Sequence, residues 1–315
     1  MDYSNLDKDG LNCISVAIVA DSLSPKGRRL TTFVLEYQRF FHSEVMTHRM
    51  LSKNAASSRA IPISKVISQV INNPAIPVWW GKNQSGMQAN VQLVGIRKWL
   101  SKQLWLKSRY FACALAYALS KVGLHKQTCN RLLEPWFVMK IIMSGTDFEN
   151  FFALRAHDDA QPEFRVLAYK MLEEYNKSKP KQLKRDEWHI PFGDKFDSER
   201  LRESQSGINL VKEYNRCGSI TQDDLQRNID NLKLKISIAR CARISYYNFE
   251  GKDDYDKDIE TCDKLFGNVP RHLSPAEHVA QALDSTEYVG NFCGFKQFRK
   301  QYEDENMKDV RVIKK

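Results

Sequence analysis

The pattern of apolar and polar positions predicts two strands and a helix in the first sixty residues. Residues 14–20 (ISVAIVA) are apolar and β-branched, and residues 30–37 (LTTFVLEY) partly alternate, so each range predicts a strand. Residues 24–27 (SPKG) between them have the composition of a turn. Residues 40–50 predict a helix, and the small polar stretch 51–59 that follows predicts a loop.

Helical spacing dominates the next hundred residues. Apolar residues recur three or four positions apart through residues 87–122, which predicts a long helix. Residues 146–149 (TDFE) match a capping box, so we expect a short helix to open there and end near Arg155. Pro162 stands where a further helix with one apolar face would begin.

The pattern changes after residue 180. Residues 180–220 are polar and rich in charge, Gly and Ser, which fits a linker, an insertion or a surface subdomain. Residues 232–246 and 255–266 predict helices, and residues 278–283 predict a strand. No internal repeat is present.

Composition narrows the class of protein. Of 315 residues, 42% are hydrophobic and 27% are charged, as in globular domains with a sizeable core. No apolar run reaches the roughly 18 residues of a membrane helix, and the first ten residues are polar, so we expect a cytoplasmic protein without a membrane partner. Seven scattered cysteines without a Cys-x-x-Cys pair favour reduced, mostly buried thiols.

The formal charge of +10 indicates an anionic partner without identifying it. The Lys and Arg residues are spread along the whole chain, and the one dense cluster, residues 177–185, has the composition of a solvated loop. Charge alone therefore fits either nucleic acid or a small phosphorylated ligand.

Residues 48–59 (HRMLSKNAASSR) hold the densest polar cluster. The planar fork of arginine suits phosphate, and Ser hydroxyls with backbone N–H groups complete such a cradle. A Ser- and Asn-rich turn that caps two helices would have the same composition. Both interpretations stay open on these residues alone.

Two further clusters follow. In residues 150–161 (NFFALRAHDDAQ), Arg155 could cap a helix through an ion pair or contact a nucleotide base. The spacing of His157, Asp158 and Asp159 fits no standard ligand pattern, so we expect no metal site. Residues 272–278 (HLSPAEH) could be a loop that leads into a strand.

Together these clusters resemble the flavin-dependent thymidylate synthases, the ThyX family. His48, Arg49, Ser52, Asn54, Ser57 and Arg59 match the signature Arg-His-Arg-x-x-Ser-x-Asn-Glu-x-Ser-x-Arg at the right spacing. Asn150, Leu154 and Arg155 match Asn-x-x-x-Leu-Arg-Ala, and Arg131 with Pro135 matches an Arg-x-x-x-Pro stretch. Residues 239–245 (ARCARIS) and 272–278 resemble the family's Arg-x-x-Arg-Val-Ser and His-x-Thr-Pro-x-Glu-His segments.

The order of these segments differs from that of the family, where the last two precede the signature. The simplest explanation is a circular permutation, which is tolerated when the chain ends lie close together. The resemblance covers residues 14–175 and 235–283, and residues 180–220 would span the ancestral termini. We therefore expect one catalytic domain over residues 1–315.

The resemblance implies an α+β fold, with a twisted, largely antiparallel sheet and long helices, assembled as a homotetramer with active sites between subunits. It implies FAD as cofactor, NADPH as reductant and methylenetetrahydrofolate as donor of a one-carbon unit to C5 of dUMP. No nucleic-acid partner is implied. Hydroxymethylation of a pyrimidine deoxynucleotide, or a non-catalytic nucleic-acid-binding protein that retains the fold, are the alternatives.

The resemblance also implies roles for residues. Arg155 would bind and polarise the pyrimidine as the catalytic residue. The other nucleotide-binding positions would be Glu44, Ser57, Ser58, Arg59 and Arg131. The FAD site would be lined by His48, Arg49, Met50, Asn54, Asn150, Leu154, Ser245, Ser274 and Glu277.

Four positions depart from the family pattern. Thr47 stands at the first signature arginine, Ala55 at the signature glutamate, Asp159 at a flavin-contacting histidine and Glu44 at a glutamine. Two of these positions contact nucleotide in the family. The departures bear on the substrate contacts more than on the flavin scaffold.

Overall fold

The computed structural model describes residues 2–193, 196–216, 221–246, 254–268, 271–302 and 305. For residues 245 and 246 this description covers the backbone alone. It confirms the α+β class, with helices around two five-stranded sheets. The first sheet has the order β3 (Ser52–Ala55), β4 (Val138–Gly145), β2 (Arg29–Gln38), β1 (Ser15–Leu23), β5 (Lys181–Gln182). The second has the order β6 (Trp188–His189), β7 (Ala280–Ala282), β10 (Phe295–Gln297), β8 (Tyr288–Val289), β9 (Phe292–Cys293). Only β1 with β5 and β8 with β10 pair in parallel among the described strands, so the sheets are largely antiparallel, as expected.

The hairpin of β1 and β2 forms as the sequence predicts. The Ser24 N–H donates to the Arg28 carbonyl (2.8 Å), and Gly27 adopts a φ of 75°, which favours glycine. The turn thereby sets a register in which Ser22 faces Leu30.

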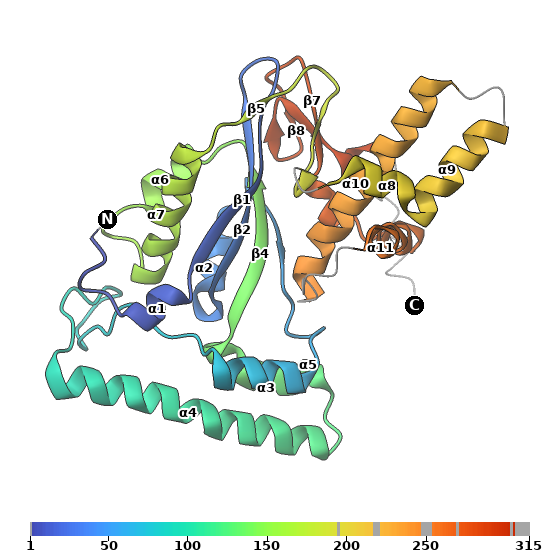
Figure 1. Ribbon diagram of the computed structural model, residues 1–315. Helices are drawn as coiled ribbons and strands as arrows, with labels where there is room; N and C mark the ends of the chain where they lie inside the picture. Colours follow the sequence, from blue (N-terminus) through green and yellow to red (C-terminus); the bar gives the residue numbers. More distant parts are fainter. Residues whose placement is uncertain are drawn as a thin grey trace, which may run out of the picture.

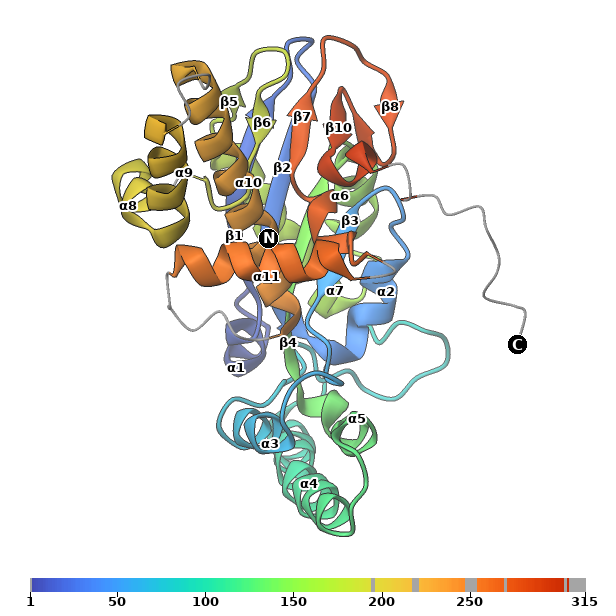
Figure 2. The same ribbon diagram turned by 90° about the vertical axis from the view of Figure 1, so that its right-hand side faces the viewer.

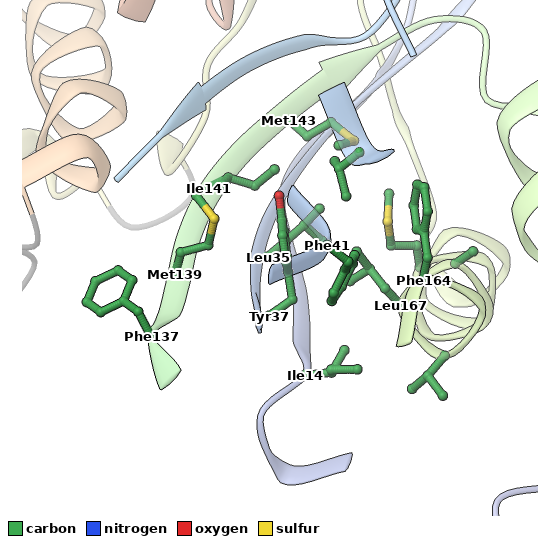
Figure 3. Packing of buried hydrophobic residues seen from close by; sticks show 14 of the residues in the cluster. Ile14, Leu35, Tyr37, Phe41, Phe137, Met139, Ile141, Met143, Phe164 and Leu167 are labelled. Carbon is green, nitrogen blue, oxygen red and sulfur yellow. The ribbon is translucent and has the colours of Figure 1, made fainter. Parts of the chain in front are cut away.

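One face of the first sheet carries the main core. Alternate residues of β2, namely Phe33, Leu35 and Tyr37, lie opposite alternate residues of β4, and all are buried. Phe164 and Leu167 from α7 (Pro162–Lys177) pack on this face (Figure 3). The neighbouring helix α6 (Glu149–Arg155) packs against α7. As predicted, α7 begins at Pro162.

The opposite face is covered by the C-terminal part of the chain. Val34 and Ile142 point away from the main core and pack with Cys241 and Ile244 of α10 (Gln222–Tyr246). Figure 1 shows the first sheet between α6 and α7 on one side and α10 on the other. Three more helices pack near α10: α8 (Ser198–Glu203), α9 (Gln205–Arg216) and α11 (Tyr255–Gly267).

The described part of residues 180–220 contains β5, β6, α8 and α9. A buried chain of hydrogen bonds holds His189 of β6 against the first sheet. The His189 ring nitrogens lie 2.9 Å from Ser22 Oγ and 2.8 Å from Thr32 Oγ1. Thr32 contacts Ser144 (2.6 Å), which contacts His278 Nδ1 (2.9 Å). The segment thus joins the first sheet to the second.

The long predicted helix is α4. It begins at Gly95, eight residues later than the start of the predicted range 87–122, and ends at Lys121. Figure 2 shows α4 with α3 (Ile63–Asn72) and α5 (Lys126–Cys129) at one end of the molecule. None of the described helices combines the length and hydropathy that a membrane span requires. The six cysteines within the described ranges are buried and unpaired, and Cys217 lies outside those ranges.

Three local predictions are wrong. Residues 51–59 contain β3, and residues 40–50 form η1 (Arg39–Phe41) and α2 (His42–Met46) instead of one helix. The capping box does not form, because the Thr146 hydroxyl donates to Asp147 and accepts from the Cys293 N–H. The first residues of α6 have no side-chain cap.

Candidate active site

Arg155 and His48 meet although 107 residues separate them. Arg155 ends α6, His48 lies in the turn before β3, and Arg155 Nε donates to His48 Nε2 at 2.8 Å. A guanidinium only donates, so the proton of His48 is on Nδ1. Burial and the charges of Arg155 and Lys53 lower the pKa of His48 to about 4, and the ring is neutral at pH 7.

Lys53 places a second cation beside this pair. Its Nζ donates to the carbonyls of His48 and Leu51, the latter at 3.0 Å. Burial lowers the pKa of Lys53 to about 8, against the opposing effect of the Glu277 charge. Within the described residues, neither Lys53 nor Arg155 forms an ion pair, so the region is suited to an anion.

His42 lies between these residues and a second group. The Tyr37 hydroxyl is 2.8 Å from His42 Nδ1, and burial raises the pKa of Tyr37. Burial, followed by the charges of Arg39 and Lys53, lowers the pKa of His42 to about 4. We call Tyr37, His42, His48, Lys53 and Arg155 the histidine–arginine cluster.

The second group, the arginine–glutamate cluster, consists of Arg39, Ser58, Arg131 and Glu134. Ser58 Oγ and Arg131 Nη1 donate to Glu134 Oε1 at 2.8 and 2.7 Å, and Arg39 Nη2 lies 3.6 Å from the same oxygen. The buried Asn130 donates to the Ser58 carbonyl at 2.6 Å and fixes the loop. Arg131, Glu134 and Asn130 all come from η2 (Asn130–Trp136).

The third group, the C-terminal cluster, consists of Ser52, Glu277, Gln297 and Arg299. The buried Gln297 amide donates to Ser52 Oγ (3.0 Å) and to the Glu277 carbonyl (3.2 Å). Arg299 forms an ion pair with the Glu277 carboxylate. Nearby, Asn54 Nδ2 donates to a backbone carbonyl of α10 (3.2 Å). This cluster attaches η4 (Ser274–Glu277) to the edge strand β3.

Several predicted residues lie outside these contacts. No hydrogen bond or ion pair within the described ranges joins them to the three clusters. Exposed side chains are those of Arg49, Met50, Arg59, Asn150, Leu154 and Ser274, whereas Glu44 and Ser57 are half-buried. Ser245 is in the last turn of α10, and its side chain is outside the described part.

Eight residues of the clusters were given no role in the sequence analysis: Tyr37, Arg39, His42, Ser52, Lys53, Glu134, Gln297 and Arg299. Lys53 lies inside the signature stretch, between Ser52 and Asn54, and this position is a sequence signal that could have identified it as a site residue. Arg39 and Glu134 each lie within a few residues of a predicted position. Gln297 and Arg299 follow the last family-like segment and carry no sequence signal.

Other regions of the described structure lack the predicted site residues. No group of three His, Cys, Asp or Glu side chains in the described ranges is arranged to hold a metal ion. A groove of about 690 Å³ runs along β1 and is lined by residues such as Ile18, Lys181 and Trp188. It contains none of the predicted site residues.

The comparisons with known proteins identify a family. Residues 24–181, which are 158 of the 315 residues, match the family described as thymidylate synthase complementing protein. No curated protein matches the chain.

Solved structures with a similar chain path were also found. Thymidylate synthase X (ThyX) from Helicobacter pylori with FAD and dUMP is 15% identical, over 46% of this chain and 67% of that chain, with a TM-score of 0.32. The UMP/dUMP methylase PolB from Streptomyces cacaoi bound with 5-Br dUMP is 13% identical, over 52% of this chain and 89% of that chain, with a TM-score of 0.40. The match to the family spans half of the sequence, and this chain therefore belongs to the thymidylate synthase complementing proteins, the ThyX family.

Proposed function

We propose that the chain is a flavin-dependent thymidylate synthase that methylates C5 of dUMP. The observation that carries the proposal is the contact of Arg155 with a neutral His48, beside Lys53, which has no carboxylate partner among the described residues. All three residues lie in the part that matches the family. A neutral histidine holds the arginine fork in place without taking its charge, so that the guanidinium stays available to an anionic ligand.

In this proposal the clusters divide the substrate between them. Arg155 contacts the pyrimidine and stabilises negative charge that develops on it. Ser57, Ser58, Arg59 and Arg131 hold the phosphate, with Glu44 near the sugar or base. The Arg59 and Arg131 side chains are exposed in the single chain, which leaves the nucleotide phosphate room to enter.

The residues around β3 fit FAD in charge and in hydrogen-bonding capacity. Asn54 is held by α10, Glu277 by Gln297 and Arg299, and Lys53 supplies a cation for a dinucleotide. His48, Arg49, Met50, Asn150, Leu154, Ser245 and Ser274 would complete the site. Bound FAD, reduced by NADPH, would supply the hydride that completes the methyl group derived from methylenetetrahydrofolate.

An anaerobic assay tests the proposal. Purified protein should be yellow, release FAD on heating, and convert dUMP to dTMP when methylenetetrahydrofolate and NADPH are present. A folded protein that stays colourless after FAD is added would refute it, and would favour a nucleic-acid-binding role instead.

The same assay distinguishes a second reaction. Thr47 replaces a signature arginine and lies 3.5 Å from Arg155 Nη2, so the neighbourhood of the base differs from the family pattern. Hydroxymethylation of a uracil or cytosine deoxynucleotide on the same scaffold is therefore the alternative. The mass of the product separates a methyl from a hydroxymethyl group.

We also propose that copies of the chain associate through α4, as in the expected homotetramer. One face of α4 packs on the body of the chain and buries Cys113 and Ala116. The rest of the α4 surface exposes large apolar side chains: Ile96, Trp99, Leu100, Leu104, Tyr110, Phe111, Leu115, Tyr117 and Leu119. Residues 110–120 contain no charge, and Ala114 and Ala118 allow a second helix to approach closely.

A further inference from the structure

We propose that Glu134 is a specificity-determining residue that occupies the phosphate site with its own carboxylate and must leave when a nucleotide phosphate binds. The inference rests on the proposed function, because it concerns the site assigned there to the phosphate. It adds a competing anion, supplied by the chain itself, to that site.

The geometry around Glu134 is that of an anion cradle. A hydroxyl, from Ser58, and a guanidinium, from Arg131, donate to one carboxylate oxygen at 2.8 and 2.7 Å, with the Arg39 guanidinium 3.6 Å away. A phosphate oxygen accepts from the same donors with similar geometry. The carboxylate therefore stands where one phosphate oxygen would bind.

The charges define the competition. Arg39 and Arg131 bring two positive charges, and Glu134 cancels one of them. While Glu134 is in place, its negative charge lies within hydrogen-bonding distance of Ser58 and Arg131, the groups that would bind the phosphate. A dianionic phosphate that approached them would therefore be repelled by the carboxylate.

Glu134 is free to move whereas Ser58 is not. The Glu134 side chain is 23% exposed and Arg131 is 49% exposed, so the carboxylate can rotate into solvent. Ser58 is buried, and the amide of the buried Asn130 holds its backbone. The Ser58 hydroxyl therefore remains in position when the carboxylate leaves, and displacement of the carboxylate lowers the affinity for the incoming phosphate.

The test compares wild type with Glu134→Gln by calorimetric titration with inorganic phosphate, dUMP and deoxyuridine. The amide keeps an acceptor for Ser58 and Arg131 but removes the charge. Glu174→Gln is the matched control, because Glu174 forms an i,i+3 pair with Lys177 on α7, as Glu134 does with Arg131 on η2. Thermal unfolding of both variants checks that they are folded.

We expect Glu134→Gln to bind inorganic phosphate and dUMP about tenfold more tightly or better, with unchanged affinity for deoxyuridine and no change in Glu174→Gln. Unchanged or weaker phosphate binding by Glu134→Gln would overturn the inference and show that Glu134 only positions Arg131. If dUMP binds to neither protein while the gain for phosphate persists, the proposed function fails and the inference about Glu134 stands.

Discussion

Arg155 differs from an ordinary surface arginine because its partner is a neutral ring and not a carboxylate. An exposed arginine ion pair contributes only about 0–1 kcal/mol to stability, and Arg155 lacks even that partner in the described residues. Its guanidinium also lies over the Phe164 ring, 4.8 Å from the ring centre. The environment preserves the charge of Arg155, which suggests a role in chemistry.

We therefore predict that Arg155→Ala keeps its FAD and melts within a few degrees of wild type, but loses turnover by about 10² or more. Arg155→Lys should rescue poorly, because an ammonium lacks the planar fork. Arg165→Ala is the control. Arg165 lies on the neighbouring helix α7 and forms an ion pair with Asp158 in the turn before that helix, so this variant should keep its turnover. Near-normal turnover of Arg155→Ala with dUMP would remove Arg155 from the proposed mechanism.

Four histidines give the protein a predictable response to acid. Burial, mainly, lowers the pKa of His42 and His48 to about 4, and of His189 and His278 to about 3. Below about pH 6.5 these rings are protonated in the unfolded chain but stay neutral in the folded chain, so acid stabilises the unfolded state. Their contribution to stability is complete above about pH 6.5 and is lost as the pH falls toward 4 and then 3.

Urea unfolding at a series of pH values between about 7.5 and 4 measures this effect. We expect the free energy of unfolding to fall steadily below about pH 6.5, and the slope to persist in His157→Gln, because His157 is exposed. A free energy that stays constant between about pH 6.5 and 5 would show that the buried rings are protonated in the folded state.

At the scale of elements, β10 supports the proposed flavin site from outside the family-like segments. Gln297 donates to Ser52 of β3 and to the last carbonyl of η4. We predict that Gln297→Leu lowers FAD affinity about tenfold, since the loss of two buried hydrogen bonds frees η4 from β3. Fluorescence titration of the apoprotein with FAD measures the change.

Gln281→Leu is the matched control for this variant. Gln281 lies on the neighbouring strand β7, and its amide donates to the Asp186 carbonyl, away from the site. Both variants should lose some thermal stability, but only Gln297→Leu should lose FAD affinity. Equal losses of affinity in the two variants would mean that Gln297 serves the fold alone.

The elements also show what a sequence can predict. The pattern located β1, β2, α7 and α11 closely, because their apolar positions repeat locally. It missed β4, whose residues 138–145 are buried on both faces and so show no alternation. It missed β3 as well, since a polar strand is fixed by its pairing with β4.

At the site, too, the sequence identifies residues in locally spaced motifs and misses contacts that form only in the folded chain. Motif spacing brought His48, Asn54, Arg131 and Arg155 to attention, and the structure places Arg155 on His48. Gln297 could not be predicted, because only the folded chain brings Ser52 and Glu277 within its reach. Glu134 lies three residues from Arg131, but only the fold adds Ser58 and Arg39 to that pair. The assigned roles of all these residues stay predictions.

At the scale of the whole molecule, the exposed apolar side chains of α4 form the proposed contact between copies of the chain. We predict that wild type is an oligomer by analytical ultracentrifugation and that Phe111→Glu gives a smaller species, because a charge at this contact opposes helix packing. Met87→Glu is the control, since Met87 is an exposed apolar residue outside α4. A mass that is the same for wild type and Phe111→Glu would place the contact elsewhere.

Early and late parts of the sequence meet in the fold. The late segments, α10 and η4, pack on β3, which belongs to the early signature stretch. The proposed site would therefore draw on both ends of the sequence, as one catalytic domain over residues 1–315 requires. The permuted order and the single domain stay predictions.

The late position of α10 has a consequence for synthesis on the ribosome. Val34 and Ile142 of the first sheet are covered by Cys241 and Ile244. The roughly 100 residues between the end of β4 and this part of α10 take about 5–20 s to translate at about 5–20 residues per second. During that interval the nascent sheet exposes an apolar face and the open edge of β3, a state in which chaperones would be expected to bind.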